Sequence, residues 1–177
     1  MGESKTTTRT PFSAALAMLA RRPYSVAELK QALEKIFPAH PANPEAIVRL
    51  RELGYLDDKK VADQVAYSLA HNRAYGPHRV RRELKSKLVD YKHIEPAIEA
   101  AYEETDARQV LEQVLERKLR TLKLPVTRQK LASLCQSLMR RGFNSGDIIK
   151  AVHARPELKP VTEKVNLSEL ESSDETD

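Results

Sequence analysis

Apolar residues recur along the chain in short stripes at helical spacing, and each stripe lies between residues that start and stop helices. Spacings of three and four residues place such side chains on one helical face, as in the run from Phe12 to Leu19. Thr10 is the predicted cap of this first helix, and Pro11 is its first residue. Continued to residue 152, the pattern predicts about nine short helices in three groups of three.

The third predicted helix follows a proline-rich loop at residues 37–44, and its boundaries come from the same rules. Asn43 is the predicted N-cap, Pro44 the first helical residue, and Gly54 the stop. The predicted buried stripe consists of Ile47, Leu50 and Leu53.

Five residues are predicted to be structural caps, because each can begin a helix and precedes an apolar stripe. They are Ser25, Asp57, Asp58, Gly76 and Asn144. Glu28 follows Ser25 by three residues and completes a Ser-x-x-Glu capping box. Asp57 and Asp58 are adjacent, so on a helix they point about 100° apart, and capping explains them better than acid-base catalysis.

A helix-elbow-helix segment is repeated along the chain as "RRPYSVAELKQAL" at 21–33, "NRAYGPHRVRREL" at 72–84 and "RRGFNSGDIIKAV" at 140–152. Each copy carries an arginine, an aromatic residue and then the predicted cap. An aromatic residue before a cap is placed to pin the entering chain onto the new helix. The copies start 51 and 68 residues apart, which is too irregular for a solenoid of fixed repeat but fits three stacked modules.

These groups predict five segments along the chain. We expect a disordered N-terminal segment at 1–10, three-helix repeats at 11–55, 56–103 and 104–155, and an acidic, disordered tail at 156–177.

Composition supports an all-α fold, since the 177 residues include only 5 glycines and no tryptophan, and 5% are aromatic. The net charge of +5 is uneven, because residues 161–177 hold six acids against Lys164 alone. A basic body with an acidic tail suggests a polyanionic partner, with the tail solubilising the chain or competing for that surface. Cys135 is the only cysteine and lies in an apolar stripe, so it is predicted to pack in the core. Without a spanning stretch or a cleavable signal, we expect a cytoplasmic protein and no membrane partner.

Basic residues are concentrated in two windows, from His71 to Lys92 and from Arg117 to Gly146. With Val80 and Leu84 facing inward, helical spacing gathers several cations on the opposite arc of one helix. Guanidinium groups in such a ridge suit carboxylates or phosphates. The candidate binding residues are Arg73, His78, Arg79, Arg81, Arg82, Lys85, Arg117, Lys118, Arg120, Lys123, Arg140 and Arg141. For the paired arginines at 21–22 and 140–141, capping of helix C-termini is an equal alternative.

Signals for catalysis or cofactors are poor. The five histidines show no metal-ligand spacing, and no glycine-rich phosphate loop is present. We expect a protein that is not an enzyme and needs no metal or cofactor.

Four segments in order resemble the RecX family of regulators of the bacterial recombinase RecA. They are "ALAMLARRPYSVAEL" at 15–29, "LRELGYLDDKKVA" at 50–62, "YGPHRVRREL" at 75–84 and "LMRRGFNSGDI" at 138–148. Family members often have glycine after the lysine of an "ELxxK" element, whereas "ELKSKLVD" places Leu88 there, so we expect a different turn before Asp90. The loop at 37–44 also looks longer than usual.

The resemblance implies an elongated, curved array of three three-helix repeats that binds the RecA-DNA filament in its groove. It implies a monomer without a cofactor that inhibits filament extension, strand exchange, ATPase and co-protease activity, and so modulates DNA repair and the SOS response. Single- and double-stranded DNA would be weaker, non-specific partners. Two alternatives stay open: a DNA-binding regulator of the helix-turn-helix kind that uses the elbow helices, and an adaptor that holds only protein partners.

Overall fold

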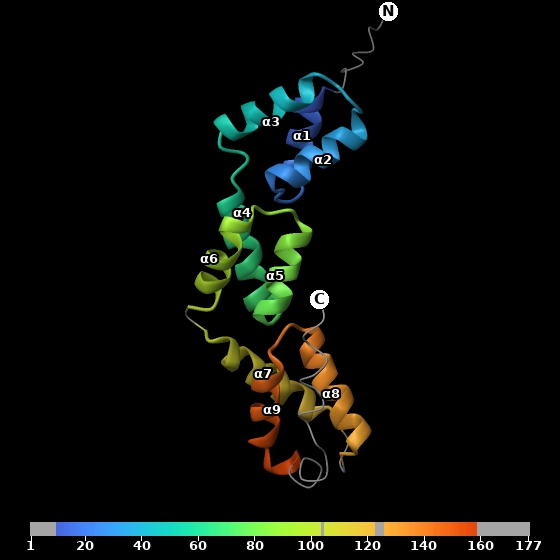
Figure 1. Cartoon of the computed structure of the whole chain (residues 1–177), viewed down its shortest axis with the longest axis vertical. Helices are drawn as coiled ribbons and strands as arrows, with labels where there is room; N and C mark the ends of the chain where they lie inside the picture. Colours follow the sequence, from blue (N-terminus) through green and yellow to red (C-terminus); the bar gives the residue numbers. More distant parts are fainter. Residues whose placement is uncertain (1–9, 104, 123–125, 159–177) are drawn as a thin grey trace, which may run out of the picture.

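The computed structural model describes residues 10–103, 105–122 and 126–158. Within these ranges the chain forms nine α-helices and no strand, so the predicted all-α fold is confirmed. The helices form three groups of three that follow one another along the long axis of the molecule (Figure 1). The acidic residues at 161–177 and nearly all of the predicted N-terminal segment lie outside the described residues.

The first group comprises α1 (Pro11–Leu19), α2 (Val26–Ile36) and α3 (Ala42–Glu52). Thr10 caps α1 as predicted, and its side chain accepts the backbone N–H of Ser13 at 3.2 Å. The apolar stripes of the three helices meet in one cluster of buried side chains. This cluster contains Ala14, Ala15, Leu29, Leu33, Ala46, Ile47, Leu50 and Leu56.

The second group comprises α4 (Asp58–Tyr67), α5 (Pro77–Ser86) and α6 (Tyr91–Ala101). A π-helical turn, Ser68–Asn72, continues α4 toward the elbow. Its His71 side chain forms a hydrogen bond of 2.9 Å with the carbonyl of Ala101, which ties this turn to the end of α6. The group has its own cluster: Val61, Ala62, Val65, Ala66, Ala70, Val80, Leu84, Val89, Ile94, Ala97, Ile98 and Ala101.

The third group comprises α7 (Ala107–Arg120), α8 (Arg128–Arg140) and α9 (Ser145–His153), followed by a short 3₁₀ turn, Pro156–Leu158. The prediction for Cys135 is confirmed, because its side chain is buried in the third cluster. In this group the repeated elbow joins the second and third helices, whereas in the other two it joins the first and second. This shift accounts for the unequal spacing of the copies.

The predicted start of the third helix is wrong. Helix α3 begins at Ala42, and Asn43 is a buried helical residue that caps nothing. Its amide donates to the Glu34 carboxylate at 3.0 Å and to the Phe37 carbonyl at 2.8 Å, which closes the preceding loop. Pro44 is tolerated in the first turn because an N–H there has no intrahelical partner.

The prediction that Leu53 is buried is also wrong. It is 54% exposed, because α3 ends at Glu52 and the chain leaves the helical path. Leu56 fills the first cluster in its place.

The capping box at α2 forms only in part. Ser25 accepts the Glu28 N–H at 3.0 Å, but the Glu28 carboxylate binds the Arg22 guanidinium, at 2.8 and 3.0 Å, and does not return to the cap. An ion pair across the elbow thus replaces the reciprocal bond.

Candidate binding surfaces

The elbow of the first group is covered by the second group. Ser25 caps α2, and its hydroxyl donates to the carbonyl of Lys87 at 2.6 Å, at the end of α5. Asp57 caps α4, while Asp58 accepts the backbone N–H of Val26 at 2.8 Å. Asp58 therefore satisfies an N–H at the start of α2, a contact between groups that its place in the sequence did not indicate.

The elbow of the second group is covered by the third group through backbone contact. The N–H of Gly76, the N-cap of α5, donates to the carbonyl of Arg141 at 2.8 Å, and the N–H of His78 donates to that of Gly142 at 3.1 Å. A Cβ on Gly76 would lie 2.3 Å from the Gly142 carbonyl oxygen, so only glycine allows this approach.

Arg141, a candidate binding residue, is engaged at this second junction. Its guanidinium donates to the carbonyl of Arg73 at 2.9 Å and to that of Ala74 at 3.2 Å. It also lies 5.7 Å from the centre of the Tyr75 ring, and Arg79 lies 5.5 Å from the same ring. Asn144, by contrast, caps α9 with an exposed side chain.

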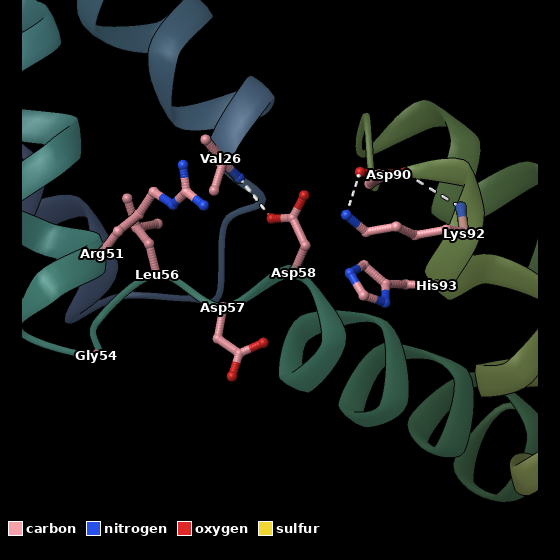
Figure 2. A pocket seen from close by; sticks show the side chains of 9 residues that line it. All are labelled: Val26, Arg51, Gly54, Leu56, Asp57, Asp58, Asp90, Lys92 and His93. Carbon is pink, nitrogen blue, oxygen red and sulfur yellow. Dashed lines mark hydrogen bonds and ion pairs between the residues drawn. The ribbon is translucent and has the colours of Figure 1, made fainter.

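A polar pocket of about 490 Å³ opens between the first and second groups (Figure 2). It is lined by Val26, Arg51, Gly54, Leu56, Asp57, Asp58, Asp90, Lys92 and His93. All three of its carboxylates have partners, since Asp57 caps α4, Asp58 binds Val26 and Asp90 pairs with Lys92 at 3.1 Å. Sequence reasoning missed the pocket because its cations come from α3 and α6, which meet only in the folded chain.

The predicted ridge lies on α5, and we call His78, Arg81, Arg82 and Lys85 the α5 surface. Arg81 binds the Glu95 carboxylate of α6 through two hydrogen bonds of 2.6 Å, and these lower the pKa of Glu95. Within the described part of the chain, the other three side chains are exposed and form no ion pair. Arg79 differs from them, because it is half-buried and paired with Glu83 at 2.6 Å.

A second group of cations gathers where α7 and α8 end, and we call Arg117, Lys118, Arg140 and Arg141 the α7–α8 cluster. Partial burial and then the charges of the three arginines lower the pKa of Lys118. An arriving anion would relieve this repulsion. Of the remaining candidates, Arg120 pairs with Glu116 at 2.7 Å, Arg73 is exposed, and Lys123 lies outside the described residues.

The described residues contain no group of three or more metal-ligating side chains, and none of their helices is long and apolar enough to cross a bilayer. The fold and its surfaces define a helical repeat protein with basic patches on its second and third modules.

Comparison with known proteins identifies the family. The family described as RecX, third three-helix domain, matches residues 104–152. The regulatory protein RecX of Stenotrophomonas maltophilia R551-3 is 32% identical over 150 residues, which cover 84% of this chain and 89% of that protein. The chain therefore belongs to the RecX family, whose members are regulators and not enzymes.

Other relatives differ in length. RecX of Oceanobacillus iheyensis is 27% identical over 146 residues, and the match covers 82% of this chain but only 53% of that protein. The crystal structure of RecX from Lactobacillus salivarius has the same fold, with a TM-score of 0.63 at 21% identity over 85% of this chain and 96% of that one.

Proposed function

We propose that this chain regulates the RecA recombinase by binding in the groove of the RecA-DNA filament. Binding there inhibits filament extension, strand exchange, ATP hydrolysis and co-protease activity, and so modulates DNA repair and the SOS response. Its partners are the RecA filament and, more weakly and without sequence preference, single- and double-stranded DNA. The chain acts as a monomer in the cytoplasm.

The proposal rests on RecX family membership together with cations that have no partner among the described residues. His78, Arg82 and Lys85 are exposed on the second module, and Arg117 and Arg140 on the third. Acidic protein surfaces and phosphates are the ligands that such groups bind. The two modules that carry these cations follow one another along the elongated molecule (Figure 1).

The direct test measures RecA ATPase activity on excess single-stranded DNA at physiological salt while this protein is titrated in. A fall in rate well below one molecule per recombinase is expected, because a regulator seated in the filament acts on more than one subunit. An unchanged ATPase rate up to equimolar protein would contradict the proposal.

The binding surface is tested with the variant His78→Gln/Arg82→Gln/Lys85→Gln. Arg81 is left in place, because its removal would leave the carboxylate of Glu95 without its hydrogen-bond partner. The control Arg21→Gln/Lys30→Gln/Lys35→Gln removes three cations that lie exposed on the first group. We expect the first variant to inhibit RecA about tenfold more weakly or worse with unchanged helical circular dichroism, and the control to inhibit as the wild type does.

The helix-turn-helix alternative is disfavoured by the junctions. A recognition helix reads bases with its N-terminal residues, and the N-caps of α2 and α5, Ser25 and Gly76, contact the next module. Competition between one chosen duplex and random duplex should therefore give nearly equal affinities. A ratio of about a thousand or more would revive this alternative.

The adaptor alternative makes the charges irrelevant to binding. If RecA were inhibited equally by the wild type and by the variant with a neutralised α5 surface, other surfaces of the modules would carry the interaction instead.

A further inference from the structure

Tyr91 is the most exposed large hydrophobic residue among the described residues. It is the first residue of α6, and 70% of its surface is open to solvent. Its ring belongs to none of the three clusters, and within the described chain it forms no hydrogen bond or ring contact.

Basic side chains lie near Tyr91, and the carboxylates beside it are already paired. Glu95 lies one helical turn further along the same face of α6 and is held by Arg81 of α5. His78 and Lys85 lie one helical turn on either side of Arg81 on α5, and both help to lower the pKa of Glu95, so these groups lie together. Asp90, the other nearby carboxylate, is paired with Lys92.

We propose that this face binds single-stranded nucleic acid, with the Tyr91 ring stacked on an unpaired base and Lys85 and Arg82 contacting the flanking phosphates. Single-strand sites combine an exposed aromatic ring with a cationic track in this way. Bases in a duplex already stack on one another, so the ring favours single strands. An acidic peptide would use the cations but not the ring. The inference rests on the proposed function for its class of partner, and it is tested without RecA so that the two can fail separately.

The lack of tryptophan in the chain allows a direct optical test. Tyr91→Trp places a single indole at the site, and oligothymidylate at low salt should quench its emission through stacking. The matched control is Tyr55→Trp, at a position 59% exposed in the loop before α4, where no quenching is expected. Unchanged emission from the Tyr91→Trp protein, while fluorescence anisotropy shows the oligonucleotide bound, would overturn the assignment.

Affinity measurements separate stacking from charge. Tyr91→Ala should weaken single-strand binding by about 5- to 150-fold, whereas Tyr91→Phe should bind within about twofold of the wild type. Duplex binding should not change in either variant. Equal losses on both kinds of DNA would contradict stacking, as would tighter binding of polyglutamate than of oligothymidylate.

The two proposals are then distinguishable. If oligothymidylate quenches the emission of the Tyr91→Trp protein but the wild type does not inhibit RecA, only the proposed function is wrong. If the wild type inhibits RecA but Tyr91→Ala binds single-stranded DNA as tightly as the wild type does, only this inference is wrong.

Discussion

Leu88 occupies a position that favours glycine. It follows the C-cap of α5 with φ of +55°, in the left-handed region where a Cβ costs about 1–2 kcal/mol. The resemblance to RecX proteins, which often have glycine here, led us to expect a different turn. Instead, leucine adopts the left-handed conformation itself, and its carbonyl stays within 3.2 Å of the Ser25 hydroxyl.

Leu88→Gly should therefore stabilise the protein by up to about 1 kcal/mol, because relief of strain exceeds the added entropy of the unfolded chain. Little apolar contact is lost, since Leu88 is 36% exposed. Urea unfolding measures the change. Lys87→Gly, at a residue with φ of −84°, is the control and should not stabilise. A lower midpoint for Leu88→Gly would contradict this account.

Gly142 tests the junction between the second and third modules. Its φ is +87°, and a Cβ would lie 2.1 Å from the backbone nitrogen of Arg79, which cannot move without breaking the junction. Gly142→Ala should cost about 2–5 kcal/mol, from backbone strain and overpacking together.

Gly54 supplies the matched control for Gly142. Its φ is +74°, but an added Cβ would meet no atom within 4 Å, so Gly54→Ala should cost only the strain of about 1–2 kcal/mol. Chemical denaturation of both variants isolates the contribution of close packing. Equal losses of stability in Gly142→Ala and Gly54→Ala would mean that close packing at the junction does not contribute to stability.

At the scale of the helix, acidic N-caps give the fold a pH dependence. Hydrogen bonds lower the pKa of Asp57 at the start of α4, chiefly from the Lys60 N–H, and the pKa of Asp90 at the start of α6, chiefly from the Lys92 side chain. A carboxyl group whose pKa is lowered by folding stabilises the fold above its unfolded pKa and loses that effect as pH falls through its folded pKa.

The melting temperature should thus be nearly constant from about pH 8 to 5 and fall below about pH 4. Asp57→Asn keeps an oxygen that accepts the cap hydrogen bonds but removes the ionisation, so its fall should be smaller. Thermal melts followed by circular dichroism across this range measure both proteins. A wild type whose melting temperature stays flat to pH 3 would exclude this role of the caps.

Helix boundaries were predictable where they depend on neighbours in the chain. Thr10 and Ser25 bond to residues three positions away, so their cap roles could be read from the sequence. The pairing of Arg81 with Glu95 spans 14 residues, and the contact of Ser25 with Lys87 spans 62. Such contacts depend on how helices and modules pack, and the sequence pattern carries no signal for them.

At the scale of the whole molecule, the elbows serve as joints between modules. Two of the three elbow copies contact the next module, while His78, Arg82, Lys85 and Arg140 remain exposed. In Figure 1 the second helix of each group, α2, α5 and α8, lies on the same side of the long axis. One filament could then meet both basic surfaces at once.

Combining variants tests whether both surfaces touch one filament. Arg117→Gln/Arg140→Gln removes exposed cations of the α7–α8 cluster but leaves Arg141 to hold its junction. Each surface variant should weaken RecA inhibition by about tenfold or more, as the loss of charge-assisted contacts predicts. If both surfaces contact the filament together, their free energies add and the combined variant should lose the product of the two factors. If the combined variant inhibits RecA no more weakly than the weaker of the two single-surface variants, only one surface contacts the filament. The other surface would then be assigned to free DNA.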